Sequence, residues 1–196
     1  LDATTNPDFG QVEADPAEVN LTAFETRFAE KRPFFLEGSS LFNIGHPNFY
    51  DSRRIGARPT GSASGDYTDY PQEANILAAA KITGRLQSRT SVAFLAAATD
   101  DETAKVAFQN VPGVVEVPVA PRAYHAVGRV LQEFGSSGSS AGLFANVVHR
   151  DFSGEEVLGN LYTKNAVGVA GNALLRFDGG EYELRLSGGG SHIDGE

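Results

Sequence analysis

The stretch that decides the fold is Asn75-Ile-Leu-Ala-Ala-Ala-Lys-Ile-Thr-Gly-Arg-Leu-Gln87. Its apolar or small residues recur at every second position, and polar residues stand between them from Lys81 onward. The first set is Ile76, Ala78, Ala80, Ile82, Gly84 and Leu86, and the second is Lys81, Thr83, Arg85 and Gln87. Because successive side chains of a β-strand point to opposite faces, this alternation predicts a strand with one apolar and one polar face.

Five further stretches repeat this pattern toward the end of the chain. They cover residues 90–99, 123–134, 141–152, 165–177 and 182–192. Turn residues separate them, and Asp178-Gly-Gly-Glu181 is a strong hairpin signal because Asp and Gly tolerate positive φ. The sequence therefore predicts an all-β fold, an antiparallel up-and-down meander in which sequential strands pair.

The chain divides near residue 72 into an irregular segment, residues 1–72, and a hairpin region, residues 73–196. Residues 1–5 read as the end of a strand. Residues 19–28 form a candidate short helix, in which two Phe side chains four positions apart share one face.

Two long connections stand out from these elements. Residues 56–71 are rich in Gly, Ser and Thr, which is typical of a mobile surface loop. The connection 100–121 is rich in Val and Pro. We expect it to be an excursion away from the main sheet.

Two environments explain a sheet with this alternation. In a soluble sandwich the apolar face meets another sheet, whereas in an outer-membrane β-barrel it meets lipid and the polar face lines the lumen. The stretches are 10–13 residues long, and barrel strands need about 9 to 11 residues against about 5 to 6 in soluble sheets. Tyr124 and Phe134 stand ten residues apart, a span of roughly 23 Å in a tilted strand. Length and aromatic spacing favour the barrel, although Gln132 interrupts the apolar face.

Composition excludes several classes of function. The 25 acidic and 16 basic residues give a net charge of -9, which argues against nucleic acid as a partner. The chain has no Cys, so it has no disulfide and no thiolate nucleophile. No run of 18 apolar residues is present, which excludes a transmembrane helix. The four His residues lack the spacing of a zinc motif, and no phosphate-binding loop occurs, so we expect neither a metal nor a cofactor.

The polar positions of the strands carry most of the basic residues of the hairpin region. We take these as candidate lumen-facing residues: Lys81, Arg85, Arg129, Arg150, Arg176 and Arg185. If the strands are neighbours, these residues form a basic strip that attracts anions or pairs with inserted acidic loops. The alternative is a solvated face whose charges are balanced by carboxylates such as Glu133 and Glu183.

Charged residues also cluster in the irregular segment. The candidate ion-pair residues are Glu25, Glu30, Lys31, Arg32, Glu37, Arg53 and Arg54. We expect the two arginines at 53 and 54 to meet the glutamates, and the adjoining Pro33-Phe-Phe-Leu36 to bury its rings against the barrel wall or rim. Asp8, Glu13 and Asp15 keep a glycoside hydrolase open as an alternative, since paired carboxylates perform that chemistry. A soluble β-sheet carbohydrate-binding module is the other alternative.

Several blocks of the chain closely resemble domain-of-unknown-function family 5916. They include Asn6-Pro-Asp-Phe-Gly-Gln-Val-Glu-Ala-Asp-Pro-Ala-Glu-Val-Asn-Leu-Thr-Ala-Phe-Glu25, Glu30-Lys-Arg-Pro-Phe-Phe-Leu-Glu-Gly38, Tyr50-Asp-Ser-Arg-Arg-Ile-Gly56 and Ala79-Ala-Lys-Ile-Thr-Gly84. Later similar blocks are Gly128-Arg-Val130 and Asn146-Val-Val-His-Arg-Asp151. The resemblance extends over nearly the whole chain.

The resemblance implies a bacterial outer-membrane β-barrel that follows an exported family-9-like carbohydrate-binding module. It implies outer-membrane lipid as a partner and a link to carbohydrate binding or uptake, with any glycan bound by a module outside this chain. It transfers no catalytic residue, and no chemistry is evident in this segment. Because the family is longer, we expect the chain to be an internal excerpt. Seven strands are too few to close a membrane barrel, so we expect open edges that prevent stable folding of the isolated chain in a membrane.

Overall fold

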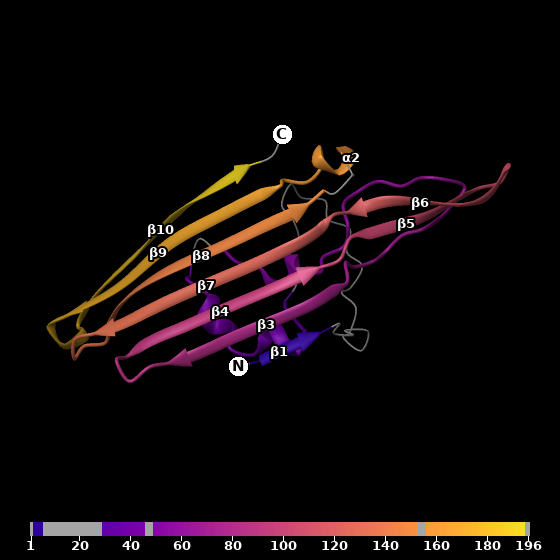
Figure 1. Ribbon diagram of the computed structural model, residues 1–196. Helices are drawn as coiled ribbons and strands as arrows, with labels where there is room; N and C mark the ends of the chain where they lie inside the picture. The colour runs from indigo at the N-terminus through magenta and orange to yellow at the C-terminus, as the bar shows by residue number, and fades with distance from the viewer. Residues whose placement is uncertain (1, 6–28, 46–48, 153–155, 195–196) are drawn as a thin grey trace.

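The computed structural model of the protein describes residues 2–5, 29–45, 49–152 and 156–194. Two antiparallel sheets build the fold (Figure 1). The larger sheet has seven strands in the order β1 (Asp2–Thr5), β3 (Ile76–Arg85), β4 (Thr90–Thr99), β7 (Arg122–Phe134), β8 (Ser139–Asp151), β9 (Asn165–Phe177) and β10 (Tyr182–Asp194). The smaller sheet has three strands in the order β2 (Tyr67–Asp69), β5 (Glu102–Phe108) and β6 (Val111–Ala120).

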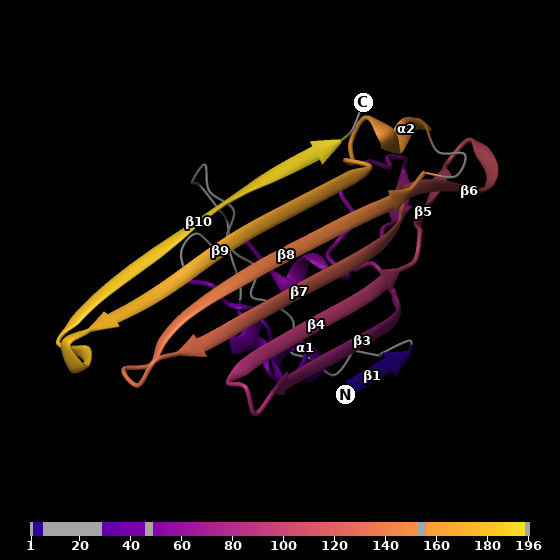
Figure 2. The same cartoon turned by 60° about the vertical axis from the view of Figure 1, so that its left-hand side comes forward.

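Short helical turns lie outside the sheets. Three of them belong to the N-terminal part: α1 (Pro33–Leu36), η1 (Ser39–Phe42) and η2 (Ser52–Arg54). Two more, α2 (Glu156–Gly159) and η3 (Asp178–Gly180), lie in the connections on either side of β9. We call residues 29–45 and 49–58 together the cover segment, because they lie across one face of the seven-stranded sheet (Figure 2).

The expected all-β antiparallel meander is confirmed. The six alternating stretches correspond to β3, β4, β7, β8, β9 and β10, and each pairs with its neighbour in the antiparallel sense. The strand predicted at residues 1–5 is β1, which pairs with β3. The Asp178-Gly-Gly turn joins β9 to β10, with positive φ at all three residues. The candidate helix at residues 19–28 lies outside the described residues.

Two connections contain strands that the sequence did not predict. The connection 100–121 forms the β5–β6 hairpin, which projects from the end of the seven-stranded sheet (Figure 1). Residues 56–71, expected to be a loop, supply β2 as its third strand. In β5 the exposed polar residues Thr103 and Lys105 alternate with the fully buried Ala104 and Val106, but the strand has only 7 residues. Such a short alternation is hard to separate from a loop rich in Val and Pro.

The two faces of the seven-stranded sheet differ in what contacts them. One face, which we call the covered face, packs on the cover segment. The other, the open face, bears large apolar side chains that no described part of the chain covers. Its exposed residues include Ile82, Phe94, Val130, Leu143, Val169 and Leu186. Phe94 is 50% exposed and Leu143 is 69% exposed, so the apolar alternation of these strands faces away from the protein core.

Ile76 departs from the predicted face. It was grouped with Ala78, Ala80 and Ile82, which lie on the open face, but Ile76 is only 3% exposed and packs in the core. The register between β3 and β4 shifts between Ile76 and Ala78. A β-bulge of this kind inserts one extra residue and moves the preceding side chains to the opposite face. Strict alternation therefore fails at the first residue of β3.

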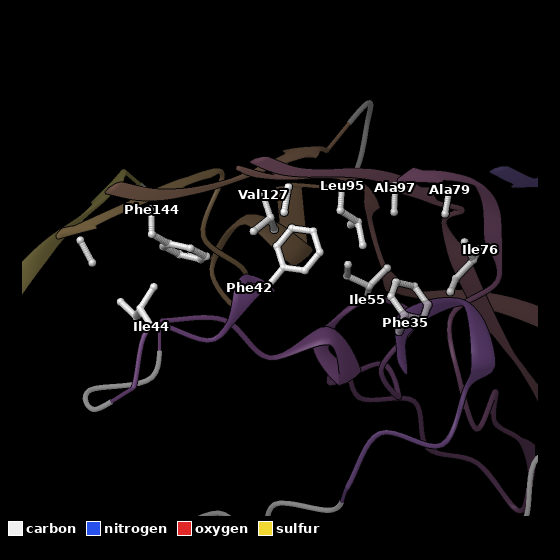
Figure 3. Packing of buried hydrophobic residues seen from close by; sticks show 12 residues of the cluster. Phe35, Phe42, Ile44, Ile55, Ile76, Ala79, Leu95, Ala97, Val127 and Phe144 are labelled. Atoms are coloured by element: carbon white, nitrogen blue, oxygen red, sulfur yellow. The ribbon is translucent and has the colours of Figure 1, made fainter. Parts of the chain in front are cut away.

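The hydrophobic core lies between the cover segment and the covered face (Figure 3). The cover segment contributes Phe35, Phe42, Ile44 and Ile55, and the sheet contributes Ile76, Ala79, Ala93, Leu95, Ala97, Val127, Phe144 and Ala170. Small Ala side chains on β3 and β4 leave room for the Phe rings that the cover segment presents. The expectation that the 33–36 stretch buries its rings is met by Phe35, which is 4% exposed.

Replacing Phe144 with Ala tests which side of the sheet is the core. Phe144 is 2% exposed and faces the cover segment, so Phe144→Ala removes buried contacts and leaves a cavity, at a cost of about 3–5 kcal/mol in the free energy of unfolding. Phe94→Ala, on the open face, is the matched control. In urea unfolding of the full-length protein we expect the Phe94 variant to lose far less stability; equal losses contradict this assignment of the core.

Candidate functional site

The covered face carries the basic residues that the sequence singled out. Lys81 and Arg85 come from β3, Arg129 from β7, Arg150 from β8, Arg176 from β9 and Arg185 from β10. Residues directly opposite each other on paired strands share a face, and the strand registers place all six on the same side of the sheet. The six nevertheless have three different kinds of environment.

Lys81 is buried against the cover segment. Its side chain is 1% exposed, and its Nζ donates hydrogen bonds to the carbonyl oxygens of Phe34 at 2.6 Å and Glu37 at 2.7 Å. These carbonyls lie at the end of α1, where the last C=O groups of a helix lack intrahelical partners. Lys81 thus joins β3 to α1 and satisfies two carbonyls that burial would otherwise leave unpaired.

Arg129 plays the corresponding role on β7. Its guanidinium donates to the carbonyl oxygens of Leu41 and Asn43, at the end of η1, and to Asn172 Oδ1 at 3.3 Å. The residue is 8% exposed. Two buried cations from different strands therefore bind consecutive turns of the cover segment through its backbone.

Three of the remaining arginines are paired with carboxylates near the turn end of the sheet. Arg85 contacts Glu133 at 2.6 Å, and Glu183 contacts both Arg176 at 3.0 Å and Arg185 at 2.5 Å. These pairs are partly exposed, so each contributes little to stability. Each of the three arginines thus contacts a carboxylate, and Arg176 and Arg185 share Glu183.

The cover segment is held in shape by Glu30 and Arg32. Their side chains form an ion pair at 2.7 Å, and Ser52 donates its hydroxyl to Glu30 Oε2 at 2.6 Å. Arg32 also donates to the carbonyls of Ser52 and Ile55 and stacks on the Phe35 ring at 4.3 Å. One carboxylate and one guanidinium thus join two parts of the segment that are about 20 residues apart in sequence.

The described contacts of the other candidate ion-pair residues are mostly with backbone groups. Arg53 donates to the Ala29 carbonyl at 3.0 Å, and Lys31 donates its backbone N–H to Glu30. The backbone carbonyl of Glu37, and not its carboxylate, accepts the hydrogen bond from Lys81 Nζ. Arg54 lines a cavity that is described below. Glu25 lies outside the described residues.

Asn146 of β8 attaches the sheet to the second half of the cover segment. Its Nδ2 donates to the Phe49 carbonyl at 2.8 Å. Its Oδ1 lies so close to the ideal position of a β-carbon at Gly168 that any larger residue there would require a shift. Glycine at 168 on the neighbouring strand is therefore the residue that makes space for the Asn146 amide.

A cavity of about 470 Å³ lies beside this contact. The cover segment forms one wall with Tyr50, Arg54 and Arg58, and the covered face forms the opposite wall with His125, Asn146 and Arg150. Tyr162, from the connection before β9, completes it. Its hydroxyl donates to the Val119 carbonyl at 2.9 Å and accepts from the Thr60 backbone at 2.7 Å. Burial, and secondly the nearby Glu30 charge, raise the pKa of Tyr50, which therefore stays protonated and able to donate.

The sequence signalled only part of this cavity. His125, Asn146 and Arg150 occupy polar positions of alternating strands, which is the available signal. Arg58 and Tyr162 lie in connections without periodicity, so only the tertiary structure brings them to the cavity.

Other chemistry finds no support in the described ranges. No group of His, Asp and Glu there is arranged to hold a metal ion. None of the helices described is long and apolar enough to cross a membrane. Asp8, Glu13 and Asp15, the carboxylates of the hydrolase alternative, lie outside the described residues.

Gly168→Ala tests the Asn146 contact. The added methyl group requires the Asn146 side chain to move, which breaks its hydrogen bond to Phe49 and lowers the free energy of unfolding by about 1–3 kcal/mol. Gly171→Ala on the same strand is the control, because a β-carbon there meets its nearest atoms at 3.6 and 3.7 Å. Chemical unfolding measures both. If the two variants lose the same stability, the close approach at Gly168 has no special role.

Glu30→Gln tests the link inside the cover segment. Burial raises the pKa of Glu30, but the hydrogen bonds from Arg32 and Ser52 outweigh it, so the folded pKa lies below the ordinary value of 4.5. The ionised form is therefore favoured by folding, and its contribution is complete above pH 4.5 and lost as the pH falls through the folded value.

We expect the Gln variant to be less stable than the parent at pH 7 and to lose less stability on acidification below pH 4.5. Glu37→Gln retains the carbonyl that Lys81 binds and is the control. Limited proteolysis of the cover segment, followed across this pH range, measures the effect. Identical pH profiles for parent and Glu30 variant contradict it.

A family model described as "Domain of unknown function (DUF5916)" matches residues 1–161. The matched part includes the cover segment, both cations that bind it and the strands from β1 to β8. A search of the curated proteins and one of the solved structures found no match. Because the family model spans most of the 196 residues, the chain belongs to the DUF5916 family.

Proposed function

We propose that the seven-stranded sheet is part of the wall of a β-barrel in a bacterial outer membrane and that the cover segment lies inside the lumen. The observation that carries this proposal is the orientation of the two faces. The face rich in apolar side chains is open, and the charged face is packed against protein. A soluble sandwich has the opposite arrangement, with its apolar face against a second layer.

Strand length supports the same proposal. Four of the strands, β7 to β10, have 13 residues each. At about 3.3 Å per residue and a tilt of about 45°, such a strand spans about 30 Å along the membrane normal, the thickness of the hydrocarbon layer. Soluble sheets rarely need strands of this length.

Aromatic side chains lie near the ends of the open face. Phe134, Phe177 and Tyr182 flank the turns that join β7 to β8 and β9 to β10, and Tyr124 lies near the other end of the sheet. All four are exposed, from 43% at Phe134 to 61% at Tyr182. Aromatic girdles at both interfaces are typical of membrane barrels, because these rings favour the boundary between lipid and water.

In this proposal the cover segment narrows the lumen. Lys81 and Arg129 hold it through backbone carbonyls, so its position depends on the wall and not on its own secondary structure. The proposed partner of the open face is outer-membrane lipid. The proposed cargo class is carbohydrate, taken up or bound by the parent protein, and this part of the proposal depends on the family resemblance alone.

Spin labels on the two faces test the proposal. The chain has no Cys, so each introduced thiol is the only labelling site within these residues, and the unsubstituted protein measures any labelling elsewhere. In full-length protein in liposomes, labels at Leu143→Cys and Val169→Cys should collide with oxygen dissolved in lipid. Labels at Thr83→Cys and Ser187→Cys, on the covered face, are the matched controls and should not.

A label on the β5–β6 hairpin serves as the reference for exposure to water. If the open-face labels collide with a water-soluble nickel chelate at the same rate as this reference, the proposal is contradicted. Recovery of the full-length protein in the soluble fraction of cells without detergent contradicts it as well.

A further inference from the structure

We propose that the cavity between the cover segment and strands β7 and β8 binds a small organic anion, a ring compound bearing one carboxylate or phosphate group. The site does not depend on the membrane assignment, because the residues that carry the argument all belong to the described part of this chain. Its volume of about 470 Å³ falls within the range of small-molecule sites, about 300–1,000 Å³.

The described lining carries more positive than negative charge. Arg58 and Arg150 line the cavity with one carboxylate among the described lining residues, Asp51; Arg54 lines it too but has further contacts of its own. Asp51 already accepts a hydrogen bond from the Arg53 backbone at 3.1 Å, because it caps η2. The cavity therefore presents net positive charge to anything that enters it.

Two of these arginines have no carboxylate partner among the described residues. Arg150 donates to the Thr163 carbonyl at 2.7 Å and lies over the Tyr162 ring at 5.6 Å. Arg58 lies over the Tyr70 ring at 5.2 Å. The contrast is with Arg85, Arg176 and Arg185, which all have carboxylate partners. Arginines whose charge is not neutralised by the protein are suited to bind a carboxylate or phosphate group through two parallel hydrogen bonds.

The remaining lining suits the body of the ligand. Phe49, Tyr50 and Tyr162 line the cavity with aromatic side chains, and His125 adds a polar group on the wall formed by the covered face. A site that combines a few convergent polar groups with aromatic surface fixes both the position and the orientation of a small ring compound. The Tyr162 hydroxyl is already occupied by Val119 and Thr60, so its ring is held in place before any ligand arrives.

Three ligands with the same sugar ring distinguish a site for carboxylates from a site for phosphates and from a site without preference for anions. Glucuronate carries a carboxylate, glucose 6-phosphate carries a phosphate, and glucose is neutral. We would measure their binding to the full-length protein in mild detergent by calorimetry, at low and high salt. We expect one or both anions to bind at least about tenfold more tightly than glucose, since charged hydrogen bonds are worth this much or more, and to weaken as salt rises.

Variants locate the site. Arg58→Gln should reduce anion affinity about tenfold, and Arg185→Gln, a covered-face arginine outside the cavity lining, should leave it unchanged. Arg58 is exposed and forms no described ion pair, so its variant is expected to fold. The ratio of the affinities of the parent protein for the anion and for the neutral sugar supplies a second readout that needs no variant.

Preference for glucuronate assigns the site to carboxylates, and preference for glucose 6-phosphate assigns it to phosphates. Equal binding of all three ligands, no binding, or an equal loss in both variants overturns the proposal. None of these results affects the membrane proposal, which the spin labels test separately.

Discussion

The structure depends on how two buried cations are satisfied. Lys81 and Arg129 stand on a face that the cover segment seals from water, and an unpaired buried charge costs several kcal/mol or more. Both donate to carbonyls at the ends of α1 and η1. The same contacts satisfy backbone groups that short helical turns leave free. Sheet and cover segment are therefore each incomplete without the other.

This constraint explains why the covered face is polar and yet packed. Phe35, Phe42 and Phe144 form part of the hydrophobic core between the sheet and the cover segment, while Asn146 and Gly168 allow the backbone at Phe49 to approach the sheet. The apolar half of each strand is left on the opposite face without a protein partner in the described part of the chain. The proposed lipid environment of that face and the proposed anion site beside the cover segment both rest on this division of side chains.

Strand positions were predictable where alternation runs long. A two-residue period over 10–13 residues is rarely accidental, so all six main strands and their antiparallel order follow from it. The β5–β6 hairpin was not predicted because its alternation is short and interrupted by Pro and Gly. The wrong face for Ile76 has a different cause: a bulge depends on how β3 pairs with β4, and side-chain type alone does not encode it.

The sequence by itself determined that the long strands have two different faces, with the charged side chains of β3, β7, β8, β9 and β10 mainly on one of them, because the pleat converts a period of two into two sides. Which side meets protein was decided only by the tertiary structure, through contacts between residues more than 40 positions apart, such as Lys81 with Phe34 and Arg129 with Leu41. The cavity, too, was decided only by the tertiary structure. Arg58, Arg150 and Tyr162 come from separate elements, and no local pattern specifies that folding brings them together.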